Sequence, residues 1–246
     1  MFPLTISHSG IVYGDIHILK KGHYQAIFEP HRRLDWSWTP SMGRPTPLAE
    51  MMGPVGSACG HHTLEAMGIS YYTASSLDGF LATEDHSLDW LFEQDFDPEG
   101  PMAYPSFIAD AGAIVMGANT YQWIMDHQDE WSYEQPTWVF THRELYIPDG
   151  ASVWATDDDV EAVGKAAIQA ADGRTVWLVG GGDLAGQFAD AGLLDEIWVQ
   201  FAPVTLGQGK PLMTRDLRLE LIESAANRSF VCTRYKVLST RESSKD

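Results

Sequence analysis

Three consecutive glycines, Gly180-Gly181-Gly182, stand between the apolar run Val176–Val179 and a helical pattern. Glycine has no Cβ atom, so a phosphate group can approach the backbone closely there. The free N–H groups and the dipole of a helix N-terminus attract such an anion. The turn therefore predicts a diphosphate site that includes Asp183 and Leu184. The alternative is a plain glycine turn that binds nothing.

A second turn of the same kind occurs earlier in the chain. Gly117, Asn119 and Thr120 follow the apolar run Ala113–Met116, again at the start of a helical pattern. These residue types also suit an ordinary helix cap, which is the alternative interpretation. In open α/β sheets, ligands bind beyond the carboxyl ends of the strands. We therefore expect this turn to contact the same ligand.

Arg143 is isolated from other basic residues and closes the sequence Thr141-His142-Arg143 after the apolar run 137–140. No lysine or arginine occurs between Arg44 and Arg143. The guanidinium is either a structural ion-pair partner or a group that binds a ligand's phosphate. Charge-assisted hydrogen bonds to a 2′-phosphate contribute about 1.5–3 kcal/mol. Such bonds predict a preference for NADPH over NADH.

Acidic residues gather after the first apolar run, where a reduced product could obtain its proton. The carboxyl candidates are Asp78, Glu84, Asp85, Asp89 and Glu93. Asp89 is the first choice, because a carboxyl group beside an aromatic wall such as Trp90 keeps its proton more readily. For each of them the alternative is an exposed loop acid or a helix cap. His86 is a weaker candidate in the same loop.

The same region is short of positive charge. Residues 76–110 contain no lysine or arginine. Lys210 and Arg215, in and after a later loop, are the basic residues considered as candidates to reach this region. A substrate phosphate needs basic partners. We therefore expect a neutral or cationic, pteridine- or pyrimidine-like heterocycle. A ribosyl phosphate suits this wall less well, and so do the carboxylates of dihydrofolate.

The elements that must position these residues alternate along the chain. Apolar runs predict strands over residues 69–74, 113–116, 137–140, 152–154, 176–179 and 196–201. Helical patterns occupy residues 88–92, 103–111, 120–125, 160–171 and 183–191. Thr156 and Asp159 resemble a capping box before the clearest of these helices.

The end of the chain differs in kind. Residues 217–222 and 231–237 alternate apolar and polar side chains, and Asn227 lies in the link between them. This pattern predicts an antiparallel hairpin. Strand–helix alternation followed by such a hairpin predicts an α/β domain with a mainly parallel, mixed central sheet.

Composition and charge argue against several classes of function. The formal net charge of −18 disfavours nucleic acid or an anionic membrane as the main partner. No apolar run approaches the roughly 18 residues of a membrane span, and no secretory signal is recognised. Cys59 and Cys232 form no disulfide framework and fit a reducing cytoplasm. A metal site from Cys59, His61 and His62 is conceivable, but no metal is expected.

The first 66 residues differ from the rest. They hold five of the 16 basic and five of the 34 acidic residues, so the whole net charge of −18 falls on residues 67–246. They are rich in proline, glycine, histidine and tryptophan and show little periodicity. We expect either a poorly ordered extension or upstream sequence that precedes a natural start at Met67. Residues 67–240 then form the domain, and 241–246 a tail.

Taken together, the motifs resemble the dihydrofolate-reductase-like superfamily, and most closely the pyrimidine reductase domain of the riboflavin pathway. The motifs are Ser76-Leu77-Asp78-Gly79, Val115–Thr120, Gly180–Gly182 and Pro203–Leu212. The resemblance spans nearly all of residues 67–240. It implies a three-layer fold, bound NADPH, chemistry like that of 5-amino-6-(5-phosphoribosylamino)uracil reductase and, on resemblance alone, a homodimer.

The resemblance also implies roles for individual residues. The expected cofactor contacts are Ala74, Gly117, Asn119, Thr120, Thr141, His142, Arg143, Gly180, Gly181, Gly182, Asp183 and Leu184. The expected substrate contacts are Ser76, Trp90 and Leu206, and the expected catalytic residues are Asp78 and Asp89. The nicotinamide belongs near Ala74 and the loop of Asp78, and the adenine side near Arg143.

Other functions remain in competition. A dihydrofolate reductase-type activity and a nucleotide-binding module without turnover both fit the glycine turns. An ordinary Rossmann dehydrogenase needs its glycine-rich turn after the first strand, whereas these glycines follow a late one. A P-loop enzyme is excluded, because the segment 207–211 lacks the motif's glycine spacing and its Ser/Thr.

Overall fold

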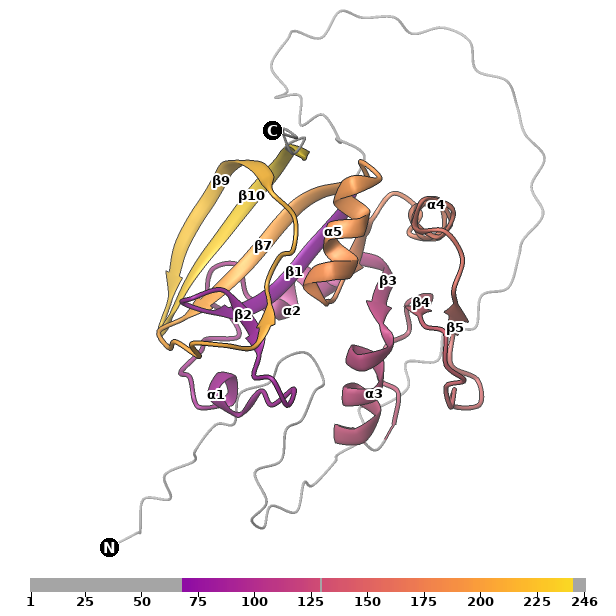
Figure 1. Cartoon of the computed structure of the whole chain (residues 1–246), viewed down its shortest axis with the longest axis horizontal. Helices are drawn as coiled ribbons and strands as arrows, with labels where there is room; N and C mark the ends of the chain where they lie inside the picture. The colour runs from indigo at the N-terminus through magenta and orange to yellow at the C-terminus, as the bar shows by residue number, and fades with distance from the viewer. Residues whose placement is uncertain (1–67, 129, 241–246) are drawn as a thin grey trace, which may run out of the picture. The chain divides into compact units, whose positions relative to one another are not determined.

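The computed structural model describes residues 68–128 and 130–240 (Figure 1). The expectations for residues 1–66 and 241–246, including the conceivable metal ligands Cys59, His61 and His62, lie outside the described residues. No helix within the described ranges is long and apolar enough to cross a membrane.

The main sheet has eight strands, and most of them are parallel. In spatial order they are β5 (Val153–Thr156), β4 (Thr137–Phe140), β3 (Ala111–Gly117), β6 (Thr175–Leu178), β1 (Ile69–Ser76), β7 (Leu194–Ala202), β10 (Phe230–Thr240) and β9 (Leu217–Asn227). Pairing is parallel from β5 through β7 and antiparallel where β10 meets β7 and β9. The predicted mixed, mainly parallel sheet with an antiparallel C-terminal hairpin is confirmed.

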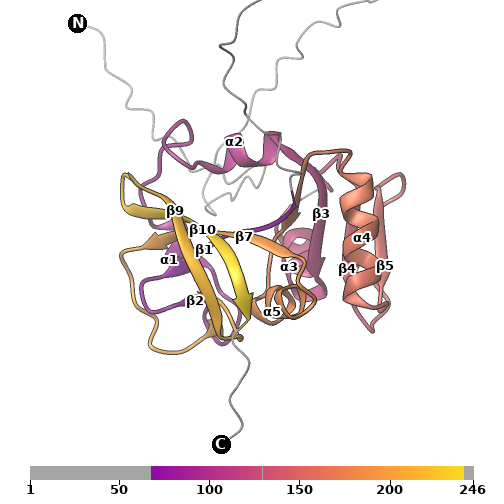
Figure 2. The same ribbon diagram turned by 90° about the horizontal axis from the view of Figure 1, so that it is seen from above.

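Helices cover both faces of this sheet. They are α1 (Asp89–Phe92), α2 (Tyr104–Ala109), α3 (Ala118–His127), α4 (Val160–Ala170) and α5 (Gly182–Asp190). Successive strand residues point to opposite faces. Accordingly Tyr71 packs in one core with α4 and α5, whereas Tyr72 packs in another with α2 and α3. The result is a three-layer α/β fold (Figure 2).

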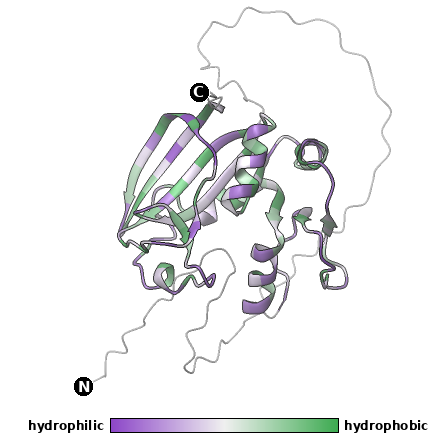
Figure 3. Cartoon of the chain, in the orientation of Figure 1, coloured by the Kyte–Doolittle hydropathy of each residue, from purple (hydrophilic) through white to green (hydrophobic). Residues whose placement is uncertain are grey.

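The hairpin β9–β10 shows the predicted alternation of hydrophilic and hydrophobic residues (Figure 3). It packs against β7, where Arg234 forms two hydrogen bonds with Glu196, at 2.7 and 2.9 Å. On the edge strand β9, the side chains of Leu219, Leu221 and Ile222 are exposed. The homodimer stays a prediction.

A small second sheet was not predicted. Strand β2 (Phe80–Ala82) pairs antiparallel with β8 (Lys210–Pro211). A Cβ atom on Gly209 would lie 2.2 Å from the carbonyl oxygen of Ala82, so glycine permits this close approach. Strands of two and three residues are too short to show any periodicity, so no sequence pattern predicts them.

The predicted capping box before α4 is wrong. Asp159 is the N-cap, and its carboxylate accepts hydrogen bonds from the N–H groups of Glu161 and Ala162 at 3.0 and 3.3 Å. Thr156 ends β5 instead, and its hydroxyl donates to Asp158 at 2.9 Å. The local turn at Thr156 therefore uses the hydroxyl that a capping box would need.

Candidate active site

A cavity of about 810 Å³ follows the carboxyl ends of β4, β3, β6 and β1. Because these four strands are parallel neighbours, their ends meet at one edge of the sheet, where open α/β folds bind ligands. All of the expected cofactor contacts line this cavity: Ala74, Gly117, Asn119, Thr120, Thr141, His142, Arg143, Gly180, Gly181, Gly182, Asp183 and Leu184. Residues from four separate segments of the chain are thereby brought together.

The two glycine turns lie side by side at the centre of this set. The N–H of Gly117 donates to the carbonyl oxygen of Gly180 at 3.2 Å. A Cβ atom on Gly181 would meet nothing within 4 Å, whereas one on Gly182 would lie 2.3 Å from the carbonyl oxygen of Pro211. Gly181 therefore leaves open space beside the backbone, and Gly182 is required for packing.

Two helices begin at the glycine turns of this cavity, and of the five described helices only α4 has a side-chain cap at its start. Helices α3 and α5 begin after Gly117 and Gly181, and neither start has a side-chain cap. Helix α4, which begins away from the cavity, is capped by Asp159. An uncapped helix leaves its first N–H groups without intrahelical acceptors. Two such starts at one cavity form a cradle for an anion, which fits the diphosphate of NADPH.

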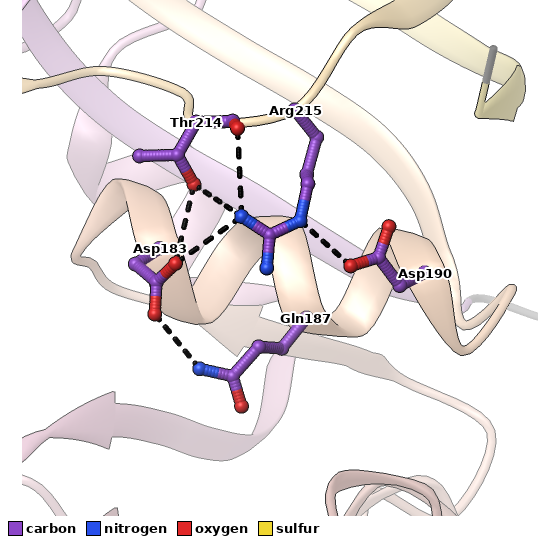
Figure 4. A network of polar contacts seen from close by, with 5 residues as sticks. All are labelled: Asp183, Gln187, Asp190, Thr214 and Arg215. Carbon is purple, nitrogen blue, oxygen red and sulfur yellow. Dashed lines mark hydrogen bonds and ion pairs between the residues drawn. The ribbon is translucent and has the colours of Figure 1, made fainter. Parts of the chain in front are cut away.

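A polar network holds the start of α5 (Figure 4). Arg215 contacts Asp190 at 2.7 Å and Asp183 at 3.2 Å. The carboxylate of Asp183 also accepts hydrogen bonds from Gln187 at 2.9 Å and Thr214 at 3.3 Å. The hydrogen bond from Gln187, followed by those from Arg215 and Thr214, lowers the pKa of Asp183. Arg215 thus offsets a negative charge at the edge of the anion cradle.

The basic end of the cavity is shaped by a local turn. The hydroxyl of Thr141 accepts a hydrogen bond from the N–H of Arg143 at 2.9 Å. The guanidinium of Arg143 then donates to the side chain of Asn119 at 3.0 Å. This contact is neutral, so the charge of Arg143 remains available for a phosphate. His142 lies 3.8 Å from Asp157, and both side chains are exposed.

Another part of the cavity lining, the aromatic end, consists of aromatic side chains. The aromatic residues there are Tyr72, Phe92, Tyr104, Trp123, Tyr133 and Trp177. Hydrogen bonds fix part of this wall. The indole N–H of Trp177 donates to the carbonyl oxygen of Tyr72 at 3.1 Å. The hydroxyl of Tyr72 donates to the carbonyl oxygen of Met102 at 3.0 Å. None of these aromatic residues was singled out from the sequence as a substrate contact.

Asp78, a predicted catalytic residue, lies outside the cavity lining. Its carboxylate accepts hydrogen bonds from the Ser76 hydroxyl at 2.6 Å and from the N–H groups of Leu206 and Gly207, the latter at 2.7 Å. The bond from Ser76 is the main cause that lowers the pKa of Asp78. These bonds tie two loops together, and the catalytic role of Asp78 stays a prediction. Gly79 completes the turn with φ of +87°.

The other expected substrate and catalytic residues also lie outside the lining. Ser76 is buried and bonded to Asp78, and Trp90 is 8% exposed, inside a third hydrophobic cluster. Leu206 packs against that same cluster, and the side chain of Asp89 is exposed. In the chain, Trp90 is the neighbour of Leu91 and Phe92. The predicted roles of these residues in substrate binding and catalysis therefore stay predictions.

His86, the weaker candidate, does line the cavity. Its backbone has a left-handed φ of +67°, which is uncommon for a residue with a side chain. The turn is held by Thr83, whose hydroxyl accepts a hydrogen bond from the N–H of Ser87 at 2.9 Å. Lys210 of β8 also lines the cavity. His86 and Lys210 are the polar groups that the aromatic end offers.

The model of the RibD C-terminal domain family matches residues 69–232. The chain belongs to this family. The match includes both glycine turns, Arg143 and the loops around the cavity, so the site described above lies within the family's domain. This RibD C-terminal domain is therefore of a reductase-like type, which agrees with the resemblance found in the sequence.

Two known proteins resemble the chain, one in sequence and one in structure. The uncharacterized protein YwjB of Bacillus subtilis is 29% identical over 159 residues, which cover 61% of this chain and 86% of YwjB. A candidate riboflavin biosynthesis protein from Shewanella sp. PV-4 has a solved structure with a TM-score of 0.61 and 24% identity, covering 70% of this chain and 99% of that one.

A bifunctional enzyme has the same fold over part of its length. It is the diaminohydroxyphosphoribosylaminopyrimidine deaminase/5-amino-6-(5-phosphoribosylamino)uracil reductase of Thermotoga maritima, with a TM-score of 0.51 and 14% identity. The match covers 72% of this chain and 58% of the Thermotoga protein. At this level of identity the comparison shows the fold alone.

Proposed function

We propose that this RibD C-terminal domain is an NADPH-dependent reductase that transfers a hydride to a pteridine- or pyrimidine-like heterocycle. One observation carries the proposal: a single cavity is lined both by an anion cradle with Arg143 and by a wall of aromatic side chains. A dinucleotide needs the first, and a flat ring suits the second. The Thermotoga reductase, which shares the fold, acts on such a heterocycle by its name.

The residues present fit NADPH along the cavity. The N–H groups at the start of α5 and the bare backbone at Gly181 would hold the diphosphate. Arg143, already directed by Asn119, would bind the 2′-phosphate. Ala74, at the carboxyl end of the central strand β1, lines the same cavity. When bound there, NADPH supplies the hydride and leaves as NADP⁺.

The heterocycle gains a C–H bond from the hydride, and the electron pair displaced from its double bond moves to a ring nitrogen or oxygen. That atom must then take one proton. His86 is placed to supply it, because it lines the aromatic end and imidazole both gives and takes protons near neutral pH. The apolar wall excludes water from the reacting atoms.

Turnover with matched cofactors tests the proposal. We expect the full chain to oxidise NADPH in the presence of a pterin or pyrimidine acceptor, with kcat/KM at least tenfold above that for NADH. Arg143→Ala removes this preference, whereas Arg228→Ala, on the distant β9–β10 turn, leaves it unchanged. Equal use of NADPH and NADH by the wild type contradicts the role of Arg143.

A nucleotide-binding module without turnover is the second candidate, because the glycine turns and Arg143 alone account for binding. It predicts tight NADPH binding and no oxidation with any ring acceptor. Turnover of a ring acceptor therefore decides against it, and binding without turnover decides for it.

A further inference from the structure

The aromatic end of the cavity has little positive charge. Among the described lining residues, the side chains that can be cationic are His86, His142, Arg143 and Lys210, and the proposed function assigns Arg143 to the cofactor. Residues 76–110, which supply part of the wall, contain no lysine or arginine at all. A phosphate dianion is bound in proteins by several charge-assisted hydrogen bonds, above all from arginine. This wall offers far fewer.

Two aromatic rings from different helices meet at this end. Phe92 of α1 and Trp123 of α3 both line the cavity, and their rings stack with centroids 6.1 Å apart and planes 22° apart. Figure 1 shows α1 on the β2 side of the molecule and α3 on the β4 side. Both rings are half-buried, so part of each ring surface is free to contact a ligand.

The plane of Trp123 is fixed from within its own helix. The ring of His127 stacks on the indole with centroids 4.1 Å apart and planes 15° apart. Nδ1 of His127 donates to the carbonyl oxygen of Trp123 at 2.7 Å, which holds the imidazole in place. Phe92, by contrast, belongs to a helix of only four residues. Of the two rings, Phe92 is therefore the one that moves more easily.

We infer that Phe92 and Trp123 clasp a planar, uncharged ring as the substrate, and that this substrate carries no phosphate. The two rings are stacked on each other, so an inserted ring needs them to separate until each lies about 3.5 Å from it. A movement of the short helix α1 provides that space. The inference rests on the proposed function and narrows its heterocyclic substrate class to neutral rings without a phosphate, such as pterins.

Binding to the full chain saturated with NADP⁺ tests the inference by calorimetry. The ring probes are 6-methylpterin, a heterocycle, and menadione, a carbocyclic quinone. A second pair of probes, uridine and uridine 5′-monophosphate, differs only in a phosphate. At least one ring probe is expected to bind. The monophosphate is expected to bind no more tightly than uridine, whereas a phosphate subsite would tighten it by about tenfold or more.

Variants then locate the clasp. Trp123→Ala and Phe92→Ala are expected to weaken the bound ring by about tenfold or more, because stacking is lost on one face. Trp123→Phe keeps a ring and is expected to retain affinity within about threefold. Trp154→Ala is the matched control, since Trp154 is 49% exposed on β5 and outside the cavity lining.

The outcomes separate this inference from the proposed function. If the wild type binds NADP⁺ but neither ring probe, or if Trp123→Ala binds the ring as the wild type does, the clasp is wrong and the cofactor site stands. Tighter binding of the monophosphate than of uridine likewise overturns the phosphate-free substrate. Failure of the wild type to bind NADP⁺ contradicts the proposed function and, with it, this inference. NADP⁺ affinity measured on each variant shows that it is folded.

Discussion

The two ends of the cavity are built in different ways. The cofactor end consists mostly of backbone: glycines, uncapped helix starts and a short turn that directs Arg143. The aromatic end consists of large side chains that come from β1, α1, α2, α3 and β6 and from the loop with Tyr133. Under the proposed function, the first end binds the dinucleotide and the second determines which substrate fits.

Gly181 tests the cofactor end with the largest expected effect. Gly181→Val places a side chain in the open space of the cradle and is expected to weaken NADPH binding by more than a hundredfold. The reason is that about two charge-assisted hydrogen bonds, worth roughly 3 kcal/mol or more together, are lost. Calorimetric titration measures the change, and the thermal midpoint reports whether the fold is kept.

Gly182 provides the matched control next to it. A Cβ atom at Gly182 would lie 2.3 Å from the carbonyl oxygen of Pro211 and 2.7 Å from that of Leu212. Gly182→Val is therefore expected to destabilise the fold by about 1–3 kcal/mol, because backbone must move. If both variants melt alike and lose NADPH alike, the distinction between the open and the packed glycine fails.

Replacement of Arg215 tests whether the negative charge of Asp183 beside the anion cradle must be balanced for NADPH to bind. Arg215→Ala leaves the carboxylate of Asp183 uncompensated beside the diphosphate and is expected to weaken NADPH binding by roughly tenfold. Adding Asp183→Asn removes that charge and is expected to restore most of the affinity. A purely structural tether predicts the opposite, with no rescue in the double variant. The NADPH affinities of the wild type, the two single variants and the double variant form a double-mutant cycle, which measures the coupling between Arg215 and Asp183.

Replacement of Asp78 has the smallest expected effect, and that effect is on thermal stability, not on NADPH binding. The lowered pKa of Asp78 means that the carboxylate stabilises the fold above its ordinary pKa, and that this stabilisation is lost as the pH falls through the lowered pKa. Asp78→Asn is expected to lower the thermal midpoint by roughly 2–4 °C at pH 7, and the difference should vanish at strongly acid pH.

Glu93→Gln, an exposed change nearby, is the control and should melt like the wild type at every pH. A proton donor at Asp78 predicts a different result, a fall in kcat of about a hundredfold or more in Asp78→Asn. Turnover within about twofold of the wild type supports the role of Asp78 as a tie between loops. Thermal melts from acid to neutral pH, together with one activity measurement, decide between the two roles.

Local sequence patterns predicted the cofactor end far better than the aromatic end. Gly117 and Gly180–Gly182 are contiguous motifs after strands, and parallel pairing brings such motifs to one edge of the sheet. Trp123 and Phe92 lie on helices whose periodicity is equally that of core residues, so their types alone carry no signal for a ligand. The contacts of the acidic loop residues could not be predicted either, because they are long-range. The carboxylate of Asp78 accepts hydrogen bonds from the N–H groups of Leu206 and Gly207, more than 120 residues away.

We propose that NADPH lies along the carboxyl ends of β4, β3, β6 and β1. A crystal structure of the full chain with NADPH tests this position. We expect diphosphate oxygens within about 3.2 Å of the N–H groups at the start of α5. Arg143 should contact the 2′-phosphate, and the nicotinamide should lie beside Ala74, facing the aromatic end. A diphosphate bound away from Gly181, or a 2′-phosphate without contact to Arg143, contradicts the account.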